Sequence, residues 1–488
     1  MSKELTTRHW AQTRRAFIGQ GAFAFLAAAG MGHRAFGATG TARLRFGALS
    51  DIHIRRGKGS CDIFEKALTY FRDQKVDAVL IAGDLADSGL DSQLRRVGET
   101  WRRVFPGDRR PDGEHVEKIF VTGNHDFEGW CYADMAVEMH ANGYSEDEAL
   151  ARIGLEEEWE RIFGEMYAPF RVRTVKGYDF VSVEWDSFEK FPEWMAANGG
   201  RFKGGKPFFF FQHMPARGTT SDSGGWDDKG AAFAALKGFP NAFAFTGHSH
   251  RPFNDERSIW QGEFTVVATP SLSYACFPPG HENGGGKRDG TSVQAMSMIP
   301  DRRDLRGGQG FFVSVYDDRM VVERIDIEED CAEGAPAWIV PLFCGEKPYD
   351  FASRAAASVA PEFPSGAKLR IDTRNPENRS GKWISAMNCE FPSAVPPKGR
   401  RVFDYEIRIV PKDGSKPMAK KFLSPAYSRM AKYEPKGQRF WFDVAELPQD
   451  VDYVVEVRAF NCFGKESRPL VSGVWHSVPG LGKVKKEG

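Results

Sequence analysis

Short runs of apolar residues recur along the first half of the chain, and each ends abruptly in polar residues. Continuous apolar runs of about four to eight residues, bounded by turn-forming residues, are typical of buried strands. Between the first two runs, Phe64–Arg72 has the spacing of an amphipathic helix. Runs of this kind predict the strands of an α/β sheet, namely Arg43–Ser50, Ala78–Ala82, Lys118–Thr122, Pro207–Gln212 and Ala242–Thr246.

Each predicted strand delivers polar side chains at its carboxyl end, where α/β sheets gather their ligand-binding groups. Oxygen and imidazole donors without a thiolate suit divalent Mn, Fe or Zn. The set is large enough for two ions that share a carboxylate. His248 and His250 would face opposite sides of a strand, so we expect them in a tight loop after Gly247. The strand-end residues are Asp51, His53, Asp84, Asp87, Asn124, His125, Asp126, His213, His248 and His250.

The segments around these strands are less regular. Residues 127–200 form a long insertion, which we interpret as a helical cap beside the site, with simple packing cover as the alternative. Residues 310–328 predict a hairpin that turns at Asp317 and Asp318. Residues 331–366, with scattered Pro, Gly and Ala, are interpreted as a linker.

The last third of the chain is β-rich. Apolar and polar residues alternate in Val402–Val410 and Phe440–Val444. Residues 367–475 have the length of a small all-β sandwich, and their later strands resemble a fibronectin type III domain. Residues 476–488 end in a run of lysines, and we expect them to be a solvated tail.

Composition limits the possible classes of protein. The 488 residues are 41% hydrophobic and 27% charged, which excludes a disordered chain and a polytopic membrane protein. Lys and Arg number 66 and so do Asp and Glu, so the chain is formally neutral. The sequence therefore does not favour a protein that binds nucleic acid through a broad basic surface, and we expect no stable nucleic-acid partner.

The first residues carry a targeting pattern. Arg14 and Arg15 precede the uncharged stretch Ala16–Gly32, and small residues follow near position 37. This segment resembles a twin-arginine export signal, which gives a signal peptide at 1–37; an N-terminal anchor helix is the alternative. We expect an exported protein, in the bacterial periplasm or secreted, with no transmembrane anchor in the mature chain.

Five short motifs follow one another in a characteristic order. Asp-x-His, Gly-Asp-x-x-Asp, Gly-Asn-His-Asp, an isolated His and Gly-His-x-His resemble the signature of calcineurin-like metallophosphoesterases over residues 43–330. The resemblance implies a four-layer α/β/β/α sandwich for this region, followed here by the smaller all-β sandwich. The motifs are Asp51-Ile52-His53, Gly83-Asp84-Leu85-Ala86-Asp87, Gly123-Asn124-His125-Asp126, His213 and Gly247-His248-Ser249-His250.

The resemblance also implies the cofactors and the roles of the motif residues. It implies two divalent ions, one bound by Asp51, His53 and His250, the other by Asn124, His213 and His248, with Asp84 bridging both. His125 is expected to face the substrate and assist the leaving group, and Asp126 to orient His125.

Other residues have weaker assignments. For Asp87, a hydrogen bond in its loop is favoured over metal binding, and its carboxylate replaces the Tyr ligand that purple acid phosphatases have there. Arg251 follows the last motif and is a weak candidate for phosphate binding, with a surface ion pair equally plausible. Trp185, Trp226 and Tyr274 are candidates for stacking on a base or a sugar, and for ordinary packing.

Taken together, the sequence predicts an exported dinuclear-metal phosphoesterase. The resemblance implies attack of a metal-bridging hydroxide on a phosphate ester, either a monoester or a diester. The alternative is a surface-binding or adhesion protein that uses the C-terminal sandwich and whose metal site is not catalytic. The sequence indicates neither the natural ester nor the oligomeric state.

Overall fold

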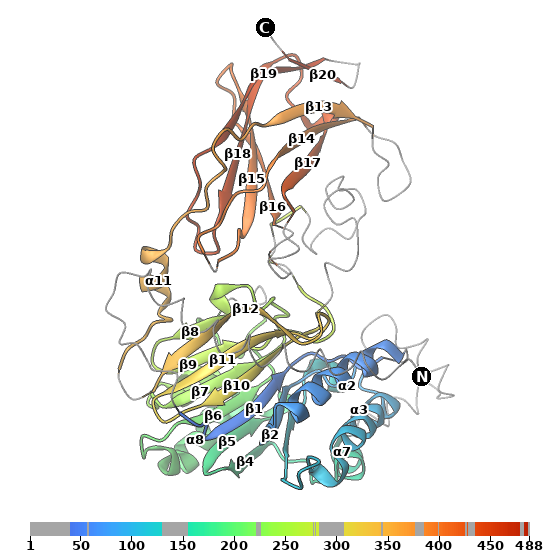
Figure 1. Cartoon of the computed structure of the whole chain (residues 1–488), viewed down its shortest axis with the longest axis vertical. Coiled ribbons are helices and arrows are strands. Elements are labelled where there is room, and N and C mark those ends of the chain that lie inside the picture. The colour runs from blue at the N-terminus through green and yellow to red at the C-terminus, as the bar shows by residue number, and fades with distance from the viewer. Residues whose placement is uncertain are drawn as a thin grey trace, which may run out of the picture. The chain divides into compact units, whose positions relative to one another are not determined.

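The structure of the protein is a computed structural model (Figure 1). The predicted signal peptide at 1–37 lies outside the residues that it describes. No helix in the described part of the chain is long and apolar enough to cross a membrane. The described residues are 40–55, 58–128, 155–220, 226–276, 278, 280–282, 307–342, 345–375, 385–398, 400–424, 427, 435–478 and 483–486.

A first mixed sheet has the strand order β12-β11-β10-β1-β2-β3. β1 pairs in parallel with β2, and β2 with β3, while β10 runs antiparallel to β1. The β10–β11 pair confirms the hairpin predicted over 310–328. The strands are β1 (Leu44–Leu49), β2 (Ala78–Ala82), β3 (Glu117–Val121), β10 (Gln309–Val315), β11 (Arg319–Asp326) and β12 (Ala332–Pro341).

A second mixed sheet has the order β4-β5-β6-β7-β9-β8. Its centre is parallel from β5 through β6 and β7 to β9, with antiparallel strands at both edges. β6 and β7 are the fourth and fifth strands that the apolar runs predict. The strands are β4 (Phe170–Val175), β5 (Tyr178–Val183), β6 (Phe208–Gln212), β7 (Ala242–Thr246), β8 (Ile259–Gln261) and β9 (Thr265–Ala268).

The two sheets share one hydrophobic cluster, to which β1 contributes Phe46 and β6 contributes Phe209. Apolar residues on the other face of the first sheet pack with α2, α3 and α7, and those of the second sheet with α8 and α9 (Figure 1). This arrangement is compatible with the four layers that the resemblance implies. The helices are α2 (Lys58–Asp73), α3 (Asp91–Val104), α7 (Leu155–Phe163), α8 (Phe191–Asn198) and α9 (Ala231–Leu236).

Three of the predicted segments differ from the structure. The interval 127–200 is not a separate cap throughout, because β4 and β5 within it are strands of the second sheet. The interval 331–366 is not a simple linker, because β12 pairs with β11 and α11 (Phe351–Ala357) follows it. Lys483–Lys486, in the predicted tail, form β20, which pairs with β19. β12 is a strand although it contains Gly334 and Pro336, because β11 pairs with it, whereas β4 and β5 are rich in the β-branched and aromatic residues that favour strands.

The C-terminal region contains two antiparallel sheets, of order β13-β14-β17 and β16-β15-β18-β19-β20. Their apolar faces meet in one cluster that includes Phe440 and Tyr405. The region is therefore all-β, as predicted. Its strands are β13 (Arg370–Arg374), β14 (Ala386–Pro392), β15 (Asp404–Pro411), β16 (Met418–Leu423), β17 (Gly437–Asp443), β18 (Asp452–Phe460), β19 (Leu470–Val478) and β20 (Lys483–Lys486).

Candidate metal centre

The polar residues that follow β1, β2, β3, β6 and β7 meet at one place in the structure. The loops after β1 and β2 remain hydrogen-bonded beyond the strands, since the N–H of Asp51 donates to the carbonyl of Gly83 at 3.0 Å and that of His53 to Asp84 at 3.0 Å. Parallel neighbours bring their carboxyl ends to the same edge of a sheet. The predicted site residues are therefore assembled by the strand order, far apart though they are in sequence.

The glycines of the motifs are required by close approach. A Cβ on Gly83, whose φ is +90°, would lie 2.3 Å from Nδ1 of His213. A Cβ on Gly123 would lie 2.1 Å from Oδ1 of Asp84. Neither position tolerates a side chain without moving a site residue, so the glycines that precede Asp84 and Asn124 have a packing reason in the site itself.

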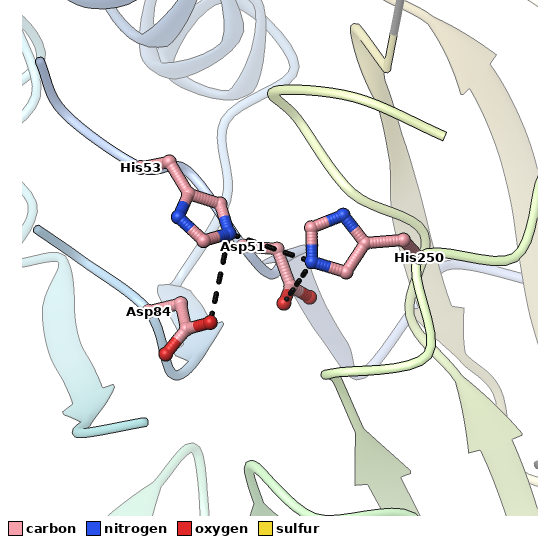
Figure 2. Close-up of side chains that lie close together, drawn as sticks. All are labelled: Asp51, His53, Asp84 and His250. Carbon is pink, nitrogen blue, oxygen red and sulfur yellow. Dashed lines mark hydrogen bonds and ion pairs between the residues drawn. The ribbon is translucent and has the colours of Figure 1, made fainter. Parts of the chain in front are cut away.

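A first group of side chains contains Asp51, His53, Asp84 and His250, and Figure 2 shows them converging. Nε2 of His53 lies 3.5 Å from Oδ2 of Asp84 and 3.4 Å from Nε2 of His250. Nε2 of His250 lies 2.9 Å from Oδ1 of Asp51. Asp51 and His53 are fully buried, and His250 is 4% exposed.

The tautomer of His250 follows from its contacts. Its Nδ1 lies 2.8 Å from the carbonyl oxygen of Tyr274, which can only accept a hydrogen bond. In the neutral ring Nδ1 therefore carries the proton, and the lone pair of Nε2 faces the carboxylate of Asp51 and the ring of His53. Lone pairs that face one another at these distances need a cation between them or a second proton on the ring.

A second group contains Asp84, Asn124, His213 and His248. Nδ1 of His213 lies 2.8 Å from the carbonyl oxygen of Ala82, so Nε2 of the neutral ring is again an acceptor. That nitrogen lies 3.1 Å from Oδ1 of Asn124, 3.2 Å from Nδ1 of His248 and 3.3 Å from Oδ2 of Asp84. Three further atoms suited to binding a cation therefore lie within 3.3 Å of this nitrogen.

Asp84 belongs to both groups through a single oxygen. Its Oδ2 faces Nε2 of His53 on one side and Nε2 of His213 on the other. Its Oδ1 accepts a hydrogen bond of 2.9 Å from the backbone N–H of His125, which fixes the carboxylate. The residues present fit a pair of divalent ions that share Asp84, because each group offers imidazole nitrogens and carboxylate or amide oxygens and no thiolate.

The charges of the site respond to this crowding. Burial opposes ionisation of Asp51 and Asp84, but the neighbouring His250 and His213 outweigh it and hold the pKa of each carboxyl well below its ordinary value. Burial lowers the pKa of His213, but attraction to Asp84 outweighs it and raises the pKa to about 9. Burial and repulsion from His213 lower the pKa of His248 to about 3. The site thus pairs buried anions with the nearest imidazole, as it would with a metal cation.

His125 lies beside the first group, in the short helix α4 (Asn124–Glu128). Its ring lies 4.6 Å from that of His53. Its Nδ1 lies 2.8 Å from the carbonyl oxygen of Asp87, which can only accept a hydrogen bond. In the neutral ring Nδ1 therefore carries the proton, and Nε2 has a lone pair. The side chain is half-buried, so unlike the fully buried His53 it is in partial contact with solvent.

Asp126 has contacts other than those predicted. Its carboxylate accepts hydrogen bonds from the backbone N–H groups of Leu85 at 3.1 Å, Ala86 at 2.7 Å and Gly123 at 2.8 Å. It therefore ties the loop after β2 to the loop after β3, while the Asp87 carbonyl holds His125. Burial and repulsion from Asp84 raise the pKa of Asp126 to about 7, against the three N–H donors.

Asp87 contacts a candidate metal ligand, which the interpretation of the sequence did not anticipate. Its Oδ1 lies 3.2 Å from Nδ1 of His53, and its Oδ2 pairs with Arg55 at 3.0 Å. A carboxylate on the far nitrogen of an imidazole fixes the ring orientation and raises its basicity. The carboxylate for which the sequence favours a loop hydrogen bond thus lies against His53, a candidate metal ligand. In the sequence, the position of Asp87 three residues after Asp84 was the feature that could have indicated this contact.

The weaker candidates separate into two positions. Arg251 is 5% exposed and donates from Nη1 to the carbonyl oxygen of Cys276 at 3.3 Å; its role in binding phosphate stays a prediction. The ring of Tyr274 lies 4.1 Å from that of His250. Trp185 and Trp226 lie 6.4 Å and 6.0 Å from the ring of His248.

Comparison with known proteins identifies the class of this region. Residues 44–252 match the family model of calcineurin-like phosphoesterases. The chain therefore contains a calcineurin-like phosphoesterase domain, which confirms the resemblance for these residues. No curated protein matches the chain significantly.

The solved structures to which the chain is similar include two phosphatases and a predicted phosphoesterase. A dimetal phosphatase from Danio rerio is 12% identical, with 62% of this chain and 100% of that chain covered and a TM-score of 0.37. A purple acid phosphatase from yellow lupin seeds is 12% identical over 61% of this chain and 53% of its own, with a TM-score of 0.36. A predicted phosphoesterase from Streptococcus pneumoniae is 15% identical over 61% and 97%, with a TM-score of 0.27.

Proposed function

We propose that the protein is a dinuclear-metal phosphoesterase that hydrolyses a phosphate monoester or diester. The observation that carries the proposal is the sharing of Oδ2 of Asp84 by two groups of buried acceptor atoms, 3.5 Å from His53 and 3.3 Å from His213. Imidazole nitrogens and carboxylate oxygens that face one another at the strand ends of a calcineurin-like phosphoesterase domain suit two cations better than hydrogen bonds among themselves.

When bound, two divalent ions would supply Lewis-acid activation of water and offset the negative charge of the phosphate. Asp51, His53 and His250 would hold one ion, Asn124, His213 and His248 the other, and Asp84 both. The amide of Asn124 contributes an oxygen without adding a negative charge beside the anionic substrate.

His125 would act on the leaving group. With its Nδ1 proton held by the Asp87 carbonyl, Nε2 can bind a proton and transfer it to the departing oxygen. Asp126 keeps the two motif loops together and so acts as a positioning residue for His125 and Asp84.

The proposal is tested with the full chain, loaded in turn with Mn, Fe or Zn, on an aryl phosphate monoester and the matching diester. We expect hydrolysis that a chelator abolishes and that metal restores. His125→Ala should lower kcat by about 10²–10⁴-fold with unchanged metal content, while His115→Ala, in an exposed pair with Glu117, should not. Equal turnover by His125→Ala and the parent chain would contradict the assignment.

We also propose that the protein is exported, to the periplasm or outside the cell, and that the C-terminal sheets form a fibronectin type III-like sandwich. The adjacent Arg14 and Arg15 before an uncharged stretch support the first part. Replacing both with lysine should retain the protein in the cytoplasm of a bacterial host. If cell fractionation found that variant exported at the level of the parent protein, the two arginines would no longer support export.

A second candidate is a surface-binding protein in which the C-terminal sandwich is the working part. The all-β architecture of residues 370–486 favours it. The full chain carrying Asp84→Asn discriminates: binding to a cell-surface polymer that survives loss of hydrolysis supports this candidate. If the parent chain binds no such polymer, this second candidate is contradicted and the phosphoesterase proposal stands by itself.

A further inference from the structure

A large cavity lies beside the second group of the metal centre. Its volume is about 710 Å³, and two indoles, Trp185 and Trp226, contribute to its wall. The ring of Trp185 lies 6.0 Å from that of His213, and both indoles lie within 6.4 Å of His248. A phosphate held at the metal centre would therefore have this cavity within reach of its organic group.

Trp226 is placed there by an anchored segment. The indole is 58% exposed, which is unusual for so large an apolar side chain. The next residues are fixed, because Asp227 pairs with Arg217 at 2.8 Å and the fully buried Asp228 accepts hydrogen bonds from the N–H groups of Arg217 and Ala232. The chain holds the backbone beside Trp226 in place while more than half of the residue's surface is exposed, an arrangement suited to binding a planar ligand.

Trp185 is fixed in a comparable way. Its backbone N–H donates to Oγ1 of Thr122 at 3.2 Å, and its ring lies 5.7 Å from that of Phe188, which also lines the cavity. Thr122 in turn donates to the buried Glu184 at 2.7 Å. Both indoles are thus presented on supported backbone at one side of the centre.

The charged lining of the cavity is balanced. Lys229 pairs with Glu189 at 2.5 Å, and Arg217 with Asp227. The lining contains three acidic and three basic side chains, Asp186, Glu189, Asp227, Lys190, Arg217 and Lys229. Such a lining offers no net attraction to a second phosphate or to a quaternary ammonium group, although aromatic rings alone would bind the latter. It suits an uncharged planar group that stacks on indole.

We propose that this cavity binds the organic part of the substrate and that this part carries an uncharged aromatic ring of nucleobase size. The inference rests on the proposed phosphoesterase function for the word substrate, but the aromatic site itself does not depend on hydrolysis. Trp185 and Trp226 would then be specificity-determining residues, and the acidic and basic pairs would set polar contacts at the edge of the ring.

The first experiment measures the site without the reaction. Adenosine, which has no ester to hydrolyse, is titrated into the full chain by calorimetry, with ribose as the matched ligand that lacks the ring. We expect binding of adenosine and none of ribose. Trp226→Ala and Trp185→Ala should each weaken adenosine binding by roughly tenfold, and Trp226→Phe by less. Phe351→Ala, which removes an exposed ring from α11, is the matched control and should have no effect.

The second experiment measures selectivity in the metal-loaded protein with pairs of esters that differ only in the ring. The monoester pair is adenosine 5′-monophosphate and ribose 5-phosphate; the diester pair is thymidine 5′-(4-nitrophenyl phosphate) and its abasic analogue, which keeps the deoxyribose and lacks the thymine. We expect kcat/KM to be higher for the ring-bearing member of the hydrolysed pair. Trp226→Ala should lower that preference, measured as the ratio of kcat/KM between the two members of the pair, by roughly tenfold.

The outcomes separate the two proposals. Hydrolysis of both members of a pair at equal rates, with no adenosine binding, would overturn the aromatic site and leave the phosphoesterase standing. Adenosine binding that depends on Trp226, without hydrolysis of any ester, would support the site and contradict the proposed function. Tighter binding of phosphocholine than of adenosine 5′-monophosphate would overturn the inference in favour of a cationic group.

Discussion

The strand ends of the phosphoesterase domain and those of the C-terminal sheets are built from different kinds of loop. In the first region, five of the predicted metal ligands have a positive φ: Asp51, His53, Asp84, His248 and His250. In the second, between residues 370 and 486, the described residues include one non-glycine residue of this kind, Asp450. The left-handed region costs about 1–2 kcal/mol for a residue with a Cβ. The phosphoesterase loops therefore hold more strain of this kind than the described loops of the C-terminal region.

The difference extends to burial and charge. Asp51, His53 and Asp84 are at most 1% exposed, and their donor atoms face one another. In the C-terminal sheets the shared core consists mainly of apolar and aromatic side chains such as Phe440 and Tyr405, and the buried carboxylate of Asp404 is paired with His281. Strain and buried like groups persist only where the surrounding structure enforces them, and they gather at functional sites. The comparison favours a ligand-binding role for the first set of loops, as proposed above, and a packing role for the second.

The largest effect that would sharpen this comparison is expected from Asp84→Asn. The amide cannot serve both groups as a shared anion, so we expect bound metal to decrease and hydrolysis to fall by about 10³-fold or more, since metal stabilisation is worth several kcal/mol. Asp404→Asn is the matched change in the C-terminal region, at a carboxylate 3% exposed that pairs with His281 at 2.8 Å.

The two variants are compared by kcat/KM, metal content and thermal unfolding. Asp404→Asn should lower the unfolding temperature without changing metal content or kcat/KM. If Asp404→Asn reduced hydrolysis as strongly as Asp84→Asn at full metal content, the division between a ligand-binding and a packing region would be wrong.

The sequence was informative where one local pattern decided the structure. β2 and β7 coincide with the predicted strands Ala78–Ala82 and Ala242–Thr246, because a continuous apolar run between turn residues has few alternatives. The motifs likewise located the residues that the structure brings together, since each motif follows a strand of its own. Their assignment to individual ions remains a prediction.

The features that the sequence did not reveal depend on partners remote in the chain. β12 contains Gly334 and Pro336 and is a strand only because β11 pairs with it. The carboxylate of Asp126 lies next to His125 in sequence yet binds the N–H groups of the loop after β2. The direction of a side chain in a tight loop is set by backbone angles such as the positive φ of Asp84, and composition does not encode these.

A smaller effect is expected from Asp87→Ala, which tests whether the ligand-shaped region extends beyond the metal donors. The change removes the carboxylate 3.2 Å from Nδ1 of His53 but leaves the backbone carbonyl that holds His125. Loss of such a partner typically lowers metal affinity or activity by about 10–100-fold. We expect a metal titration to show this loss, with activity recovered at high metal concentration. Asp112→Ala, which breaks the pair with Arg110 at 3.1 Å, should leave the metal titration unchanged. A metal affinity equal to that of the parent would confine the site to its direct donors.

The smallest effect concerns a carboxylate that neither region of the comparison explains. Glu323 lies on β11 in the phosphoesterase domain, away from the strand-end loops, with Glu333 on the neighbouring strand β12. Burial and the charge of Glu333 raise its pKa from 4.5 to about 7. Because Glu323 lies away from the proposed metal centre, we expect a change of its charge to affect the stability of the protein and to leave its catalysis unchanged.

The sign of this effect follows from proton linkage. The folded state binds the Glu323 proton more tightly than the unfolded state. The contribution of Glu323 to the free energy of unfolding is therefore greatest below pH 4.5 and decreases as the pH rises toward about 7. Glu323→Gln keeps the shape and removes the charge, so it should abolish that decrease and stabilise the protein by roughly 3 kcal/mol above neutral pH. Denaturant unfolding on both sides of this interval measures the change, with kcat/KM as the second readout. An altered kcat/KM would mean that the functional region reaches β11, whereas equal stability of both proteins at every pH would mean that Glu323 is ionised without cost in the folded state.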